Sequence, residues 1–159
     1  MPPVTPAVTT TASAASAMPA SSSTPPQGLS AITNIVPQGT SEGQGGPERM
    51  VDGDNSTYFF TGKVPQPGDY IGVDLRSLQP VYSVSVKMGT TSFPNDYIAH
   101  AALEYSTDGV GWTGAGTFTN TANVEATFPA GTQARYVRLR ATDTDPFWLR
   151  IREFAVSTS

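Results

Sequence analysis

Residues 81–88 read Val-Tyr-Ser-Val-Ser-Val-Lys-Met, so apolar and polar side chains alternate along this stretch. A period of two is typical of a β-strand with one buried face, which here would carry Tyr82, Val84, Val86 and Met88. The same alternation predicts strands over four further ranges: 70–75, 101–106, 135–141 and 149–156. Turn-forming residues separate these runs, and no segment shows a sustained helical period. Short strands with regular turns indicate an all-β fold, either a sandwich or a barrel.

The last predicted strand contains a break in its alternation. Leu149 and Ile151 share one face, whereas Phe154 and Val156 share the other. A β-bulge inserts one extra residue and resets the alternation, so the pattern predicts a bulge near Arg152 and Glu153. Such a bulge would change the direction in which the Glu153 side chain points.

The composition divides the chain into two parts. Residues 1–28 are almost entirely Pro, Thr, Ala and Ser, and no charged residue precedes Glu42. A segment with so little to bury is predicted to be a disordered linker. Residues 29–159 have the usual size of one domain, about 100–150 residues. Linkers of this composition separate the modules of extracellular bacterial enzymes, so we expect a secreted or cell-surface module, monomeric and covalently linked to other modules.

The charge and the absence of cysteine exclude several classes of protein. Nine basic residues stand against thirteen acidic ones, giving a net charge of -4, and there is no cysteine. Disulfides and thiolate chemistry are therefore excluded, and neither nucleic acid nor a membrane surface is expected as a partner. The arginines near the C-terminus are interpreted as outward-facing and solvated: Arg135, Arg138, Arg140, Arg150 and Arg152.

Residues 50–57 read Met-Val-Asp-Gly-Asp-Asn-Ser-Thr and offer carboxylate, hydroxyl and carbonyl oxygens within one turn. Oxygens at this density suit Ca²⁺, which takes about 6–8 oxygen ligands. The spacing is not that of an EF-hand, because no acidic residue stands at Val64 or Pro65. The alternative is an Asp-Gly turn held by local hydrogen bonds.

Three segments combine aromatic rings with amide, carboxylate or cationic groups, and they cover residues 58–63, 91–97 and 143–148. A sugar ring stacks its apolar face on an aromatic ring, while Asn, Asp and Lys bond to its hydroxyls. The alternative is that these aromatic residues pack in the core where loops enter strands. Trp112, which follows a hairpin turn, is predicted to be core packing.

Catalysis has little support in the sequence. His100 is the single histidine, and nucleophile–base arrangements would all depend on it. Asp143 and Asp145 form a carboxylate pair, but their turn-rich segment predicts exposure, without the burial that shifts the pKa of a general acid. We therefore expect a protein that is not an enzyme.

Five segments, in order, resemble the discoidin or coagulation factor 5/8 type C superfamily: 47–60, 68–75, 103–109, 135–140 and 151–154. Within it, the chain is most similar to family 32 carbohydrate-binding modules of bacterial β-N-acetylglucosaminidases and hyaluronidase-like glycosidases. The resemblance implies a jelly-roll β-sandwich, a structural calcium ion and a shallow, lectin-like sugar site in the loops at one end. The implied ligand is galactose, N-acetylgalactosamine or N-acetylglucosamine, and the implied role is to target an attached glycosidase.

The resemblance also implies particular residues. The metal ligands would be Asp52, Asp54, Thr57 and Glu153, and the sugar-binding residues would be Phe60, Lys63, Asn95, Asp96, Phe147 and Trp148. Phe60 stands where the family commonly has tryptophan, and no His-and-Arg pair matches the galactose-binding members. This departure favours a ligand of the N-acetylglucosamine type. An adhesion or protein-interaction domain, or a structural spacer without sugar binding, is the alternative.

Overall fold

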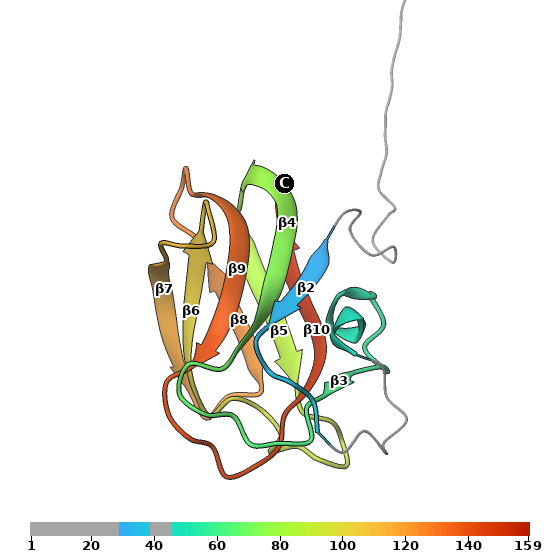
Figure 1. Cartoon of the computed structure of the whole chain (residues 1–159). Coiled ribbons are helices and arrows are strands. Elements are labelled where there is room, and N and C mark those ends of the chain that lie inside the picture. The colour runs from blue at the N-terminus through green and yellow to red at the C-terminus, as the bar shows by residue number, and fades with distance from the viewer. Residues whose placement is uncertain (1–28, 39–45) are drawn as a thin grey trace, which may run out of the picture.

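The computed structural model describes residues 29–38 and 46–159, which form a sandwich of two antiparallel sheets (Figure 1). The first sheet has the order β2 (Ser30–Thr33), β4 (Tyr70–Pro80), β9 (Gln133–Ala141), β6 (His100–Ser106), β7 (Thr113–Thr119). The second has the order β3 (Phe59–Phe60), β10 (Arg150–Ser157), β5 (Ser83–Met88), β8 (Asn123–Thr127). A 3₁₀ turn, η3 (Pro47–Val51), lies beside them. The predicted all-β sandwich is confirmed, whereas the predicted linker, 1–28, lies outside the described residues.

The core lies between the two sheets and takes alternate residues of β5 and of most of β9. In β5, Val84, Val86 and Met88 are buried, as the alternation predicted. Tyr82, predicted to share their face, is exposed instead. The reason is local, because Tyr82 lies in the connection before β5 begins, where its N–H donates to the carbonyl of Ser157.

The predicted bulge in β10 is confirmed by the register of the strand. Ile151 pairs with Met88 and Glu153 pairs with Lys87, which leaves Arg152 as the extra residue. The residues that the alternation placed on opposite faces are consequently all buried in the core: Leu149, Ile151, Phe154 and Val156.

The outer face of the five-stranded sheet carries arginines that face outward, as predicted, but they are paired with carboxylates instead of being solvated. Arg138 and Arg140 each donate to the carboxylate of Glu104 at 2.8 Å, and Arg135 donates to Asp74 at 2.8 Å. Bonds from Arg140 and Arg138 hold the pKa of Glu104 below its usual range.

Trp112 also belongs to this outer face, because the Arg138 guanidinium carbon lies 3.8 Å from the centre of its ring. It is half-buried, and the prediction that it packs in the core is wrong. A strand-like alternation cannot distinguish a ring in the core from a ring that covers a sheet from outside.

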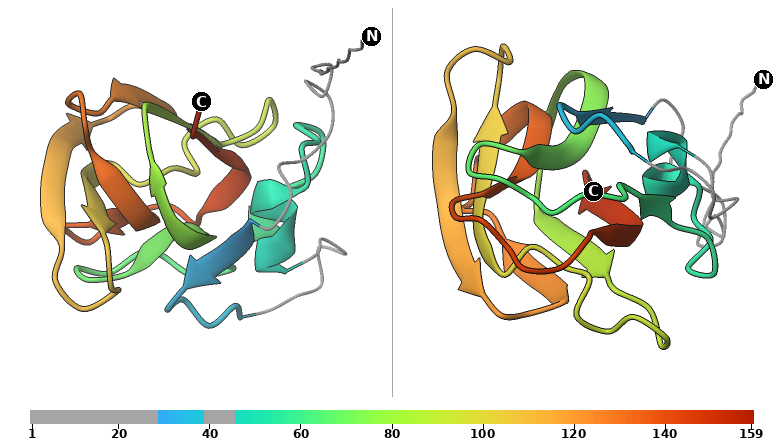
Figure 2. Two further views of the ribbon diagram at one scale, coloured as in Figure 1. Left: turned by 90° about the horizontal axis from the view of Figure 1, so that it is seen from above. Right: turned by 60° about the horizontal axis from the view of Figure 1, so that its bottom comes forward.

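Three loops leave the sheets at one end of the sandwich: 61–69, 89–99 and 142–149 (Figure 1, bottom). Figure 2, right, brings this end forward. Gly62 has a φ of +63° and lies so close to the chain that an added Cβ would fall 1.8 Å from the carbonyl oxygen of Gln38. Glycine is therefore required where the first loop begins.

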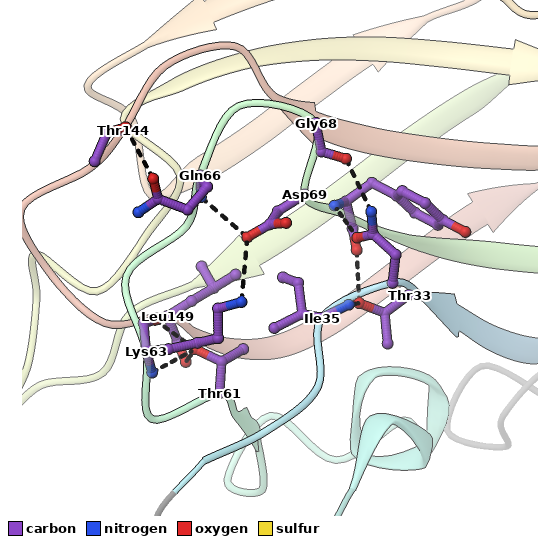
Figure 3. A network of polar contacts seen from close by, with 11 residues as sticks. Thr33, Ile35, Thr61, Lys63, Gln66, Gly68, Asp69, Thr144 and Leu149 are labelled. Carbon is purple, nitrogen blue, oxygen red and sulfur yellow. Dashed lines mark hydrogen bonds and ion pairs between the residues drawn. The ribbon is translucent and has the colours of Figure 1, made fainter.

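A network of polar contacts holds the first of these loops (Figure 3). Gln66 N donates to Asp69 Oδ2 at 3.0 Å, and Thr144 donates to the Gln66 side chain at 3.2 Å, which connects loop 142–149 to loop 61–69.

Among the described residues, no helix is long and apolar enough to cross a membrane.

Candidate functional site

A buried ion pair forms the floor of the loop end. Arg150, the first residue of β10, is 1% exposed, and its guanidinium donates to the carboxylate of buried Asp96. The backbones are joined as well, since Arg150 N donates to the Asp96 carbonyl at 3.1 Å and Gly89 N donates to the Arg150 carbonyl at 2.8 Å. These contacts clamp loop 89–99 to β10. The interpretation of Arg150 as a solvated side chain is wrong.

Aromatic rings surround this arginine. The Arg150 guanidinium carbon lies 3.8 Å from the ring centre of Phe93, 4.2 Å from that of Phe60 and 5.5 Å from that of Tyr58. Rings offer a buried cation an attractive, water-free environment. The ring of Phe60 also meets Trp148 edge-on, with ring centres 5.5 Å apart. Phe60 is only 6% exposed, so in this arrangement it supports Trp148 and Arg150 from below.

Above the ion pair lies a shallow hollow of about 200 Å³. Its rim exposes large aromatic surfaces, because Trp148 is 49% exposed and Phe147 and Phe93 are each 46% exposed. The complete lining, which we call the central hollow, consists of Phe93, Asp96, Pro146, Phe147, Trp148 and Arg150. Exposed rings around a charged floor can stack on the apolar face of a polar ring and bond to its edge.

The central hollow unites three of the six predicted sugar-binding residues, namely Asp96, Phe147 and Trp148. Asn95 lines an adjoining hollow of about 240 Å³, of which Phe147 is also a wall. Lys63 lies apart from both, with its Nζ 3.8 Å from Asp69 in the network of Figure 3.

Three residues of the central hollow were missed by the sequence prediction, Phe93, Pro146 and Arg150. Phe93 and Pro146 lie in two of the aromatic segments, so a signal for them existed. Arg150 gave no such signal, because at the edge of a strand a buried arginine and a solvated one have the same sequence pattern.

The adjoining hollow contains a second buried carboxyl group, that of Asp145. Its Oδ2 accepts a hydrogen bond from Ala99 N at 3.0 Å, while Oδ1 has no hydrogen-bond partner among the described residues. Burial raises the pKa of Asp145. The prediction that this carboxyl is exposed in a turn is therefore wrong. Its bond to the Ala99 backbone ties loop 142–149 to the start of β6.

The predicted metal ligands gather where loop 52–57 meets the bulge of β10. Glu153 Oε1 accepts a hydrogen bond from Gly53 N at 3.2 Å, and Thr57 Oγ1 donates to Asp52 Oδ2 at 2.6 Å. Burial, with the nearby charge of Asp52, raises the pKa of Glu153 to about 7. The oxygen atoms of Asp52, Thr57 and Glu153 therefore lie close together at this point, and the nearby charge of Lys87 offsets part of the effect of Asp52 on Glu153.

One of the predicted ligands turns away from this point. Asp54 Oδ1 accepts hydrogen bonds from the N–H and the hydroxyl of Ser56, and these bonds lower the pKa of Asp54. Within 29–38 and 46–159, no three acidic or histidine side chains converge as a ready set of metal ligands. The oxygen donors match the chemistry of Ca²⁺, but Asp54 would have to rotate to join Asp52 and Glu153.

Comparison with known proteins places this geometry in a family. Residues 28–154 match the family model of the F5/8 type C domain. No curated protein sequence matches the chain.

Solved structures with the same fold include three carbohydrate-binding modules. Chitosan-binding module 2 of a chitosanase/glucanase from Paenibacillus sp. IK-5, in complex with chitotriose, is 22% identical with a TM-score of 0.64, over 85% of this chain and 98% of that one. CBM32-1 from a family 31 glycoside hydrolase of Clostridium perfringens is 16% identical with a TM-score of 0.66, over 83% and 95%. CpGH89CBM32-5 from Clostridium perfringens, in complex with GalNAc-β-1,3-galactose, is 17% identical with a TM-score of 0.66, over 80% and 94%.

At these identities the similarity to solved structures establishes the fold, in agreement with the two-sheet topology. The match to the family model independently covers nearly all of the described residues. The protein belongs to the F5/8 type C domain family.

Proposed function

We propose that this protein is a non-catalytic carbohydrate-binding module that holds one sugar unit in the central hollow. The observation that carries the proposal is the exposure of Trp148, Phe147 and Phe93 around the buried pair of Arg150 and Asp96. The rings provide stacking surface, and the fixed charges beneath provide directional hydrogen bonds. A hollow that is this open encloses one sugar only partly, so weak binding is expected.

The solved relatives support a ligand of the hexosamine or galactose type. Chitotriose is bound by the Paenibacillus module, and GalNAc-β-1,3-galactose by a Clostridium module. We extend this chemistry to the present chain as N-acetylglucosamine, N-acetylgalactosamine or galactose, within a host or other complex glycan. The module would act outside the cell, as a monomer attached to a glycoside hydrolase, and would raise the local concentration of its substrate.

Calorimetric titration of the domain with N-acetylglucosamine, N-acetylgalactosamine, galactose and glucose tests the proposed function. We expect saturable binding of at least one sugar with Kd of about 1 mM, which corresponds to about 4 kcal/mol. Binding to a protein partner, with no response to any of these sugars or to their oligomers, would instead identify an adhesion domain. Silence toward both sugars and proteins would leave a structural spacer.

A structural calcium ion is a second part of the proposal. It is supported by the gathering of Asp52, Thr57 and Glu153 oxygens, where burial and the charge of Asp52 raise the pKa of Glu153. Asp54 would complete the set after rotation. An ion there would offset the charge of the Asp52 and Glu153 carboxylates and would link loop 52–57 to β10. The chain has no cysteine, so no disulfide can make such a link.

Removal of calcium with a chelator is expected to lower the thermal stability of the domain. An ion that binds only the native state at about a hundred times its Kd adds about 2.7 kcal/mol to the free energy of unfolding. Glu153→Gln should abolish this response and should be more stable than the parent without calcium, because one carboxylate no longer faces Asp52. Glu125→Gln, an exposed change on β8, is the control and should keep the full response. Equal melting temperatures with and without calcium in the parent protein would contradict the proposal.

A further inference from the structure

A third hollow, larger than the central hollow and the adjoining hollow of about 240 Å³, shares Phe93 with the central hollow as a wall. Its volume is about 630 Å³, within the range of about 300–1,000 Å³ that is usual for small-molecule sites. We call it the side hollow, and its lining is Asn55, Ser56, Tyr58, Met88, Gly89, Thr90, Thr91, Ser92, Phe93, Pro94, Ala122, Asn123 and Arg152. Hydroxyl, amide and aromatic groups predominate, and no carboxylate is among them.

Arg152 is the charged group of the side hollow, and the β10 bulge explains its position. On the partner strand β5, Met88 pairs with Ile151 and the next residue back, Lys87, pairs with Glu153. Arg152 therefore has no opposite residue, and its side chain leaves the regular alternation. Its Nε is buried and has no hydrogen-bond partner among the described residues. A buried donor without a partner is costly unless something else accepts its hydrogen bond.

The neighbouring arginines make the contrast clear. Arg135, Arg138, Arg140 and Arg150 each lie within an ion pair with a carboxylate of this chain. Arg152 forms no ion pair with any described residue. Glu153, its neighbour in sequence, bonds to Gly53 instead. The side hollow is therefore lined by a guanidinium group with which no carboxylate of the described residues pairs.

We propose that the side hollow binds an anionic sugar unit, carrying a carboxylate or a sulfate, next to the unit held in the central hollow. The inference rests on the proposed function and specifies its ligand as an acidic oligosaccharide. Arg152 would donate to the anion through its planar guanidinium group, which matches such groups with two parallel bonds. Phe93, exposed between the two hollows, would contact both units.

Titration with tetrasaccharides of matched length tests this assignment. Hyaluronan tetrasaccharide alternates glucuronic acid with N-acetylglucosamine, and N-acetylchitotetraose is its neutral counterpart. We expect the acidic chain to bind about tenfold more tightly, or by about 1.4 kcal/mol, because a hydrogen bond to a charged group is stronger than one to a neutral group. This advantage should shrink as salt rises. A chondroitin 4-sulfate tetrasaccharide distinguishes the two anions, since a preference for it over hyaluronan would identify sulfate as the recognised group.

Arg152→Gln should reduce the affinity for the acidic chain to that for N-acetylchitotetraose and leave the neutral affinity unchanged. The control is Arg76→Gln, which removes the same charge from an exposed residue of β4 that lines neither hollow. If the neutral chain binds but the acidic chains bind no better, or if Arg152→Gln changes nothing, the inference is wrong and the proposed function stands. If no chain binds at all, the proposed function fails with it.

Discussion

Replacing Trp148 with alanine is expected to weaken sugar binding by more than about tenfold without unfolding the domain. Half of the indole is exposed at the rim of the central hollow, and its inner edge rests on Phe60. Truncating a central aromatic contact commonly costs a binding site about 2 kcal/mol or more. Because the ring covers little of the core, the melting temperature should fall only slightly. Calorimetric titration and thermal unfolding of the same sample measure the two effects together.

The two tryptophans of the chain provide a matched control for this experiment. Trp112→Ala removes an identical side chain from the outer face of the five-stranded sheet, where it stacks on Arg138. Its affinity for sugar should equal that of the parent protein. Trp148→Phe should retain part of the affinity, since a smaller ring can still stack. An unchanged affinity for sugar in Trp148→Ala would mean that the sugar does not bind in the central hollow.

Arg150→Met is expected to lower the free energy of unfolding by about 3–5 kcal/mol, the usual cost of removing one partner from a buried ion pair. The variant leaves the Asp96 carboxylate buried without the guanidinium that donates to it. Loop 89–99 and the rings of Phe93 and Phe60 lose the side chain on which they pack. Denaturant unfolding monitored by circular dichroism measures the change.

The double variant Asp96→Asn/Arg150→Met separates the ion pair from general packing. If the ion pair accounts for the loss of stability, the double variant should be destabilised by less than the sum of the two single variants. With both residues changed, no buried charge is left without its partner. Additive losses would mean that the pair is not coupled, and that packing alone stabilises the floor of the site.

Much of the fold follows from the alternation of side chains. In β5 and β9, each residue's face is set by its position along the strand, and the packing of the core enforces that order. The bulge in β10 was predictable for the same reason, since a core position cannot be filled by a residue that faces away. The face of Tyr82 was predicted wrongly because β5 begins at Ser83, one residue after the first member of the predicted buried face.

The site was only partly predictable because its central feature is a tertiary contact. Asp96 and Arg150 are 54 residues apart, and the sequence around either one does not show that the other lies beside it. The same holds for Asp145, whose burial depends on the backbone of Ala99. Aromatic residues in loops gave a usable signal, because an exposed ring at a loop tip contributes little to folding. That signal indicated Trp148 and Phe147 but could not tell Phe60, a supporting ring, from a ring that faces solvent.

The central claim, that sugar binds in the central hollow, is tested most directly by the two indole N–H signals of the domain in a two-dimensional NMR titration. With N-acetylglucosamine or its β-linked oligomers, the Trp148 signal should shift saturably while the Trp112 signal stays in place. A sugar that binds and moves Trp112, or that leaves Trp148 unmoved at saturation, would contradict the account.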